Sequence, residues 1–151
     1  MDITISNRQR AVRVDLGWLR RIAVAALEEC LPLSGDGRFA LRALDEIDIA
    51  IVSDAAIARV HVEFMGIPGA TDVITFDHGE IVVSAQTAAV CANERGHSVD
   101  DELALYMVHG FLHLNGYDDR TPADRRAMHA VQNRVWRKVI SSRDRRAANL
   151  R

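Results

Sequence analysis

The stretch EIDIAIVSD, residues 46–54, decides the fold class of this chain. Its apolar and polar side chains alternate, and Ile47, Ile49 and Ile51 fall on one side. A period of two residues predicts a strand with one face in a core. Ser53 or Asp54 then offers the side-chain oxygen that begins a helix. A strand that passes directly into a helix is typical of an α/β protein.

The same patterns, read outward from this stretch, predict the remaining elements. Strands are expected over residues 2–6, 72–76 and 80–83, and helices over residues 16–31, 55–64, 85–95, 99–114 and 122–142. Asp77, His78 and Gly79 suit a tight hairpin between two of the strands. The order of elements predicts an α/β (α+β) single domain, with a small mixed sheet of about four strands and about five helices.

The chain has 151 residues, of which 48% are hydrophobic, so one compact domain can bury a full core. We expect this domain over residues 1–142 and a basic C-terminal tail over residues 143–151. Neither a secretory signal nor a membrane-spanning run is visible. Cys30 and Cys91 have no metal-like spacing, so we expect a reduced, cytoplasmic protein without a disulfide partner.

Basic residues gather near both ends of the chain, although the net charge is −2. The negative balance argues against a protein that holds nucleic acid by bulk charge alone. Two interpretations of the basic ends stay open: solvated helix faces with a frayed tail, or a phosphate-contacting surface where the ends meet. The residues concerned are Arg8, Arg10, Arg13, Arg20, Arg21, Arg134, Arg137, Lys138, Arg143, Arg145, Arg146 and Arg151.

The segment HGFLHLNGYDD, residues 109–119, carries the chemistry that the sequence indicates. His109 and His113 are four residues apart in a predicted helix, which stacks both imidazoles on one face. The helix stops near Gly116, so the following loop can bring Asp119 back to the same point. Two imidazoles and a carboxylate form a sound zinc ligand set, with a fourth position left for water.

The spacing of these two histidines also has an explanation that involves no metal. Two histidines at this spacing also occur by chance on ordinary surface helices. Gly110 favours a functional site, because a glycine inside a helix is destabilising and suggests a close approach by another backbone or a substrate. Gly110 also stands where metalloprotease helices carry a glutamate base, which argues against a peptidase of the usual type. We expect His97 and His129 to be surface residues and His78 to be a turn residue.

HGFLHLNGYDD resembles the HGxLHLxGYDH signature of the YbeY endoribonuclease family of bacterial rRNA maturation factors. Upstream, TDVITF (residues 71–76) and GEIVVS (residues 79–84) are similar to two further family segments. The resemblance covers roughly residues 46–139. It implies a metal-dependent, single-strand-specific endoribonuclease that acts in small-subunit rRNA 3′-end maturation and ribosome quality control. Its partners would be rRNA and the small ribosomal subunit.

The resemblance also implies a ligand set of His109, His113 and position 119, holding one divalent metal per chain, with Zn²⁺ favoured. Position 119 is Asp where the family has His, and a carboxylate should weaken the metal as a Lewis acid and favour harder ions. Asp118 is given a supporting role. Glu80 is a weak candidate for a base, and an exposed strand-end carboxylate is the favoured interpretation. No catalytic or substrate-binding residue is assigned.

A second departure lies at Met65, where the family pattern places an arginine thought to contact phosphate. Met offers none of the paired hydrogen bonds that an arginine gives a phosphate. Arg120, Arg125 or Arg126 is a hypothetical substitute. The alternative function is therefore a ribosome-associated RNA-binding or assembly factor with a structural metal and little nuclease activity. A metal-dependent hydrolase acting on another substrate is a third possibility.

Overall fold

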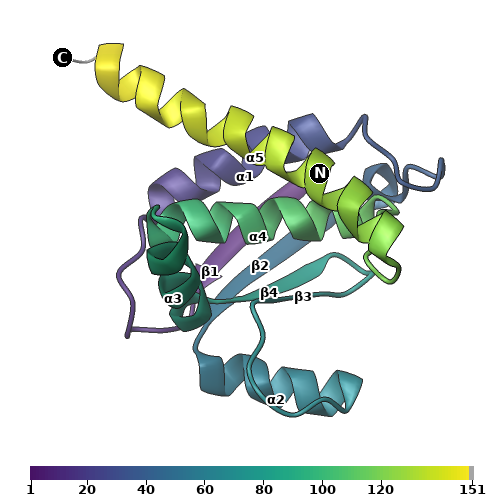
Figure 1. Ribbon diagram of the computed structural model, residues 1–151, viewed down its shortest axis with the longest axis horizontal. Helices are drawn as coiled ribbons and strands as arrows, with labels where there is room; N and C mark the ends of the chain where they lie inside the picture. Colours follow the sequence, from purple (N-terminus) through teal and green to yellow (C-terminus); the bar gives the residue numbers. More distant parts are fainter. Residues whose placement is uncertain (150–151) are drawn as a thin grey trace.

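The computed structural model describes residues 1–149, and across them the chain forms four strands, five α-helices and one 3-10 helix (Figure 1). The strands are β1 (Asp2–Asn7), β2 (Glu46–Val52), β3 (Val73–Thr75) and β4 (Glu80–Ser84). The helices are α1 (Leu16–Cys30), η1 (Ala40–Ala43), α2 (Asp54–Met65), α3 (Ala85–Arg95), α4 (Val99–Leu114) and α5 (Pro122–Asn149). The predicted α/β class is confirmed, and η1 is the element that the sequence patterns did not indicate.

The sheet is mixed, with strand order β1-β2-β4-β3. The first three strands in this order run parallel, and β3 pairs antiparallel with β4. Ile49 at the centre of β2 lies opposite Ile5 on one side and Ile81 on the other. The hairpin between β3 and β4 is the one predicted at Asp77, His78 and Gly79.

Helices cover both faces of the sheet, and the alternation along β2 explains how. Ile47, Ile49 and Ile51 belong to the larger core, which packs beneath α1, α3, α4 and α5. Ala50 and Val52 point to the opposite face, where they pack with Ile57 of α2. Figure 1 shows this division, with α2 below the sheet, α1, α4 and α5 above it, and α3 beside one end of it.

Helix α4 lies at the centre of the upper layer, where it contacts α1, α3, α5 and two strands. Most of its residues are buried, as expected for a helix that is apolar nearly all round. At Gly110 the helix lies close against the side chain of Ile81 on β4. A Cβ there would lie 2.7 Å from Ile81 Cδ1. The expectation that Gly110 admits a backbone or a substrate is thus wrong, because a buried side chain of β4 fills that space.

The helix ends follow the capping residues seen in the sequence. Asp15, Ser53, Ser84 and Ser98 each accept a hydrogen bond from a backbone N–H in the first turn of the helix that follows. Gly96 ends α3 in the left-handed region, at φ 76°. These side-chain and glycine caps satisfy backbone groups that a helix leaves unpaired at its ends.

Helix α5 continues to Asn149 and does not end near Ser142. Residues 143–149 contain no glycine or proline and are rich in arginine and alanine, which favour helix. The division into a domain over 1–142 and a basic tail over 143–151 stays a prediction, and its last two residues lie outside the described part.

Both cysteines carry free thiols. Burial raises the pKa of the Cys30 thiol to about 12, so this thiol stays protonated and unreactive. Across residues 1–149, no helix has the length and apolarity needed to cross a bilayer.

Candidate metal centre

Helix α4 and the loop after it bring the three predicted ligands together. His109 and His113 lie on the last turns of α4, and their rings are 4.5 Å apart between centroids and nearly perpendicular. Asp119 lies on the loop between α4 and α5 and returns over the end of the helix. Their ligand atoms all fall within 4.8 Å of one another, and among the described residues they form a group that could hold a metal ion.

The distances between these atoms fit a metal better than direct hydrogen bonds. Asp119 Oδ2 lies 3.5 Å from His113 Nε2 and 3.8 Å from His109 Nε2. Good N–H···O hydrogen bonds measure about 2.7–3.2 Å. Two donor atoms bound tetrahedrally at zinc distances lie roughly 3.4 Å apart. The three side chains therefore converge on one point without forming good hydrogen bonds to one another. They are a suitable ligand set for the divalent cation that the family resemblance implies.

Hydrogen bonds on the far side of each imidazole fix which nitrogen faces this point. His109 Nδ1 lies 2.6 Å from Gln132 Oε1, and His113 Nδ1 lies 3.0 Å from the backbone oxygen of Tyr117. Both partners are acceptors, so each Nδ1 carries the proton and each Nε2 keeps a lone pair free. Ligating histidines in metal proteins are commonly oriented in this way.

The environment of His109 also favours the neutral form that binds a metal. Burial lowers the pKa of His109, because desolvation penalises the imidazolium, and the nearby His113 adds to the lowering. The hydrogen bond to Gln132 and the carboxylates of Asp119 and Asp72 act in the opposite direction. The net shift of the His109 pKa is downward, so the neutral form persists to a lower pH than in an ordinary histidine.

Asp118 shapes the loop that presents Asp119. Its Oδ1 accepts hydrogen bonds from the backbone N–H groups of Asp119 and Arg120, at 2.7 Å and 3.2 Å. Its Oδ2 lies 3.4 Å from Arg120 Nε. These contacts form a turn around the Asp118 carboxylate. The supporting role expected for Asp118 stays a prediction, and these contacts are the ones through which it would act.

Asn115 anchors the beginning of this loop to another part of the chain. Its side chain is fully buried; Oδ1 accepts from Leu41 N–H at 3.2 Å, and Nδ2 donates to the carbonyl oxygens of Cys30 and Leu33. Gly35 N–H donates to the Asn115 carbonyl oxygen at 3.1 Å. The segment between α1 and η1 is thus fastened to the end of α4. The sequence indicated Asn115 only as a helix stop and gave no signal for this role.

An open groove of about 570 Å³ contains the candidate metal centre. Carboxylates of Asp72, Asp77, Asp118 and Asp119 line it together with Arg120. Met65 lies at its wall with 47% of its surface exposed, at the position where the family pattern has arginine. Of the three arginines proposed as substitutes, Arg120 lines the groove, whereas Arg125 and Arg126 are exposed on α5 and do not.

The structure places the other histidines and Glu80 mostly as expected. His78 and His129 are exposed. Glu80 is partly exposed, with Oε2 3.2 Å from His78 Nε2. The expectation that His97 is a surface residue is wrong. Its Nε2 lies 2.6 Å from the fully buried Glu102, and its ring packs on Trp136, because the turn at Gly96 folds it back onto α4.

Gln132 is a site residue that the sequence did not reveal. It lies on α5, is 7% exposed, and holds His109 from a position distant in sequence.

The basic ends of the chain do meet, because α1 and α5 pack side by side (Figure 1). Arg20 and Arg21 are exposed on α1, as are Arg134 and Arg137 on α5. Whether this surface contacts phosphate stays a prediction.

Fold and site together define a class: a single α/β domain with a candidate divalent-metal centre on a central helix and its following loop. The chain belongs to the YbeY family, since the family model described as endoribonuclease YbeY matches residues 4–140. The resemblance found in the sequence is confirmed.

Three comparisons illustrate the relationship. An endoribonuclease YbeY of Clavibacter sepedonicus is 34% identical over 152 aligned residues, which cover 89% of this chain and 93% of the relative. One from Thermobifida fusca is 34% identical over 122 residues, covering 68% and 79%. The solution structure of TM1509 from Thermotoga maritima matches with a TM-score of 0.64 over 95% of this chain and 93% of that one. Its 21% identity supports the fold alone.

Proposed function

We propose that this chain is a metal-dependent endoribonuclease that cleaves single-stranded RNA, with the 3′ end of small-subunit rRNA as its substrate and the small ribosomal subunit as its partner. The convergence of His109, His113 and Asp119 in an open groove is the observation that carries the proposal. His109, His113 and Asp119 would hold one divalent ion per chain, with Zn²⁺ favoured by the two imidazoles. This ribosomal role would place the protein in the cytoplasm.

The charge of the groove supports dependence on a cation. Its walls carry the carboxylates of Asp72, Asp77, Asp118 and Asp119 beside the guanidinium of Arg120. A phosphodiester is itself an anion, and like charges a few ångströms apart repel. A bound divalent ion would offset this repulsion and polarise a phosphoryl oxygen as a Lewis acid.

The protein's own groups would bind and orient the RNA strand. Arg120 projects from the ligand loop with 86% of its side chain exposed, and its guanidinium can donate paired hydrogen bonds to a phosphate. We infer that Arg120 supplies the phosphate contact that Met65 cannot. Asp118 orients this arginine through its Oδ2.

Metal-dependent cleavage is the decisive test. The purified protein is chelated, reloaded separately with Zn²⁺, Mn²⁺ or Mg²⁺, and incubated with single-stranded and duplex fragments of the rRNA 3′ end. We expect cleavage of the single strand by the reloaded protein, lost in His113→Ala and retained in His78→Ala, which changes an exposed histidine outside the groove. Arg120→Ala should slow cleavage, whereas Arg126→Ala should not.

The second candidate function is an RNA-binding assembly factor with a structural metal, and Met65 in the groove favours it. In the same assay, RNA binding without cleavage at any metal would support this function and refute the nuclease. Elemental analysis that finds no transition metal in protein prepared without chelators would refute the metal centre in both.

A further inference from the structure

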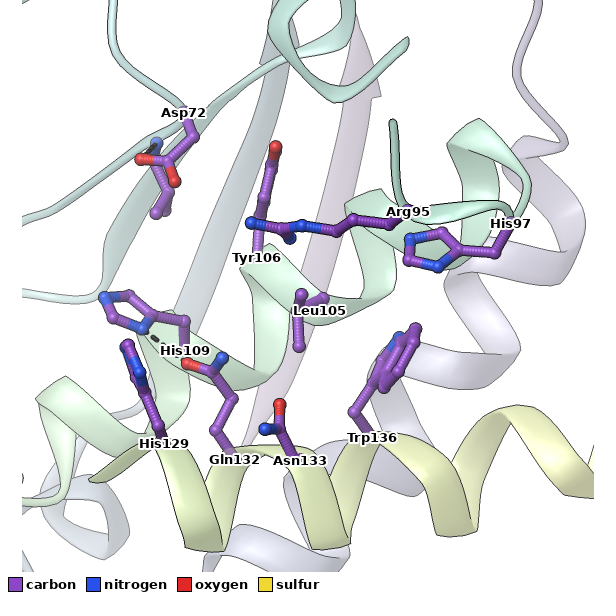
Figure 2. A pocket seen from close by; sticks show the side chains of 11 residues that line it. Asp72, Arg95, His97, Leu105, Tyr106, His109, His129, Gln132, Asn133 and Trp136 are labelled. Carbon is purple, nitrogen blue, oxygen red and sulfur yellow. Dashed lines mark hydrogen bonds between the residues drawn. The ribbon is translucent and has the colours of Figure 1, made fainter. Parts of the chain in front are cut away.

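A second cavity, of about 430 Å³, adjoins the metal groove and is not used by the proposed reaction. Asp72, Val73 and His109 line both spaces, so the cavity opens directly beside the ligand His109. Figure 2 shows it between α5, which carries Gln132, Asn133 and Trp136, and the end of α3, which carries Arg95. Small-ligand sites have volumes of about 300–1,000 Å³, so this cavity is in the size range of a small ligand such as a single nucleoside.

An aromatic platform forms the wall opposite His109 (Figure 2). Trp136 Nε1 donates to the Asp101 carbonyl oxygen at 2.7 Å, and the indole packs against His97 with centroids 5.1 Å apart. His97 is held in turn by the buried carboxylate of Glu102, at 2.6 Å. The indole is therefore fixed before any ligand arrives, and a rigid aromatic ring loses little entropy when a base stacks on it.

Polar groups with spare hydrogen-bonding capacity line the floor along α5. Asn133 lines the cavity, and its amide makes no hydrogen bond within residues 1–141, the part of the chain whose side chains the structure describes, so its donor and its acceptor are available to a ligand. Gln132 Oε1 accepts a hydrogen bond from His109 Nδ1, and in Figure 2 the amide nitrogen of Gln132 turns toward the cavity. Gln132 thus touches both the ligand imidazole and the second cavity.

Arg95 completes the cavity from the side of α3. Its Nη1 donates to Glu102 at 2.6 Å, and half of its side chain, 51%, remains exposed. In Figure 2 its guanidinium reaches across the cavity toward Tyr106. The ion pair with a buried carboxylate keeps this planar cation in place, where it can lie against a base or contact a phosphate.

We propose that this cavity receives one unpaired base of the RNA strand whose backbone crosses the metal groove. The base stacks on Trp136, and the amides of Asn133 and Gln132 meet its edge. A fixed aromatic ring, free amides and a guanidinium are the groups by which proteins bind splayed-out bases of single-stranded RNA. A base still paired in a duplex cannot enter, so the cavity also selects for single strands. This inference rests on the proposed function, because it assumes an RNA strand at the metal groove.

The test is an abasic scan combined with variants of the cavity. Short fluorescein-labelled oligoribonucleotides, each lacking one base, are tested for cleavage by metal-loaded protein and for binding by anisotropy after chelation. Stacking of one base on an aromatic side chain contributes about 1–3 kcal/mol, or about 5-fold to 150-fold in affinity at ~1.4 kcal/mol per tenfold. We expect such a loss when the base at one position near the cleavage point is removed.

The variants show whether that base lies on Trp136. The abasic loss should disappear in Trp136→Ala and persist in Trp136→Phe, which keeps a ring. Asn133→Ala removes no contact within the protein and so keeps the fold; it should weaken binding of the intact strand about 2-fold to 10-fold, as for one hydrogen bond. Asn93→Ala, an exposed asparagine on α3, is the matched control and should change nothing.

The remaining outcomes overturn either the base site alone or the proposed function as well. Cleavage of RNA with no sensitive position, or with the same sensitivity in Trp136→Ala, overturns the base site and leaves the proposed function standing. RNA that is neither bound nor cleaved overturns the proposed function, and the base site with it.

Discussion

Asn115→Ala should destabilise the protein far more than a helix-end asparagine normally would. The Asn115 side chain is fully buried and joins the end of α4 to two other segments. Its Oδ1 accepts from Leu41 N–H, and its Nδ2 donates to the carbonyl oxygens of Cys30 and Leu33. Alanine would remove these three hydrogen bonds, although the Cys30 carbonyl oxygen would still accept from Leu33 N–H.

The structure sets the size of the effect. A typical hydrogen bond contributes about 1 kcal/mol net, and a buried group left unsatisfied costs about 1–3 kcal/mol. Three lost partners therefore predict a loss of at least roughly 3 kcal/mol in the free energy of unfolding. At roughly 2–4 °C per kcal/mol for a chain of this size, the melting temperature should fall by about 6–12 °C.

Urea unfolding of the chelated protein measures this loss without a contribution from metal. Asn115→Asp provides a sharper comparison, because it keeps the shape and the acceptor for Leu41 N–H. It replaces the donor with an anionic oxygen facing the carbonyls of Cys30 and Leu33, so it should be at least as destabilising as alanine. Asn93→Ala, on the exposed side of α3, should stay within about 0.5 kcal/mol of the parent.

The reasoning would be refuted by a loss below about 1 kcal/mol in Asn115→Ala. It would also be refuted if Asn115→Asp were clearly more stable than Asn115→Ala. Either result would mean that the contacts of the side chain do not hold the loop.

Three further predictions concern the site and the helix that carries it. Gln132→Ala frees the His109 ring and should weaken Zn²⁺ binding about 10-fold to 100-fold, which is the range for partners of ligating histidines. The affinity is measured by competition with a chelating dye, and an unchanged affinity would show that Gln132 does not orient the ligand. Burial lowers the pKa of His109, so below pH about 6.5 the unfolded chain takes up a proton there before the folded chain does. The free energy of unfolding of the metal-free protein should therefore decrease as the pH falls from 6.5, and it should decrease more than that of the His109→Gln variant. Parallel pH profiles of the two proteins would contradict this. Gly110→Ala places a Cβ against Ile81, and the resulting overpacking should lower the free energy of unfolding by about 1–3 kcal/mol. The better helix propensity of alanine should offset about 1 kcal/mol of this loss. Ile81→Val should recover part of that loss in the Gly110→Ala background although it destabilises the parent, and simple additivity of the two changes would count against the close contact.

The elements could be predicted from the sequence because their signals are local. The alternation at Ile47, Ile49 and Ile51 reflects a strand with different surroundings on its two faces. Caps such as Ser84 and Ser98 act on backbone groups within one turn of themselves. The spacing of His109 and His113 is likewise a local property of a helix, so the pair can be recognised from the order of residues alone.

What the sequence did not show depends on contacts between distant residues. Gln132 approaches His109 only because α5 packs across α4. His97 turns inward because Glu102 is buried beneath it, and no periodicity marks that pairing. The glycine at position 110 stands out in the sequence, but its reason, a side chain from β4, follows from how the helix sits on the sheet.

The three candidate ligands lie within residues 109–119, a span of sequence much shorter than the contacts that build the sheet. An unfolded chain would keep these side chains close together and so retain part of the affinity for a transition metal. A ligand protects a fold only to the extent that it prefers the native state over the unfolded one. Saturating zinc should therefore raise the unfolding temperature by less than its dissociation constant alone would imply. Metal captured by a nascent or partly denatured chain would also remain nearby while the sheet and α5 assemble around it.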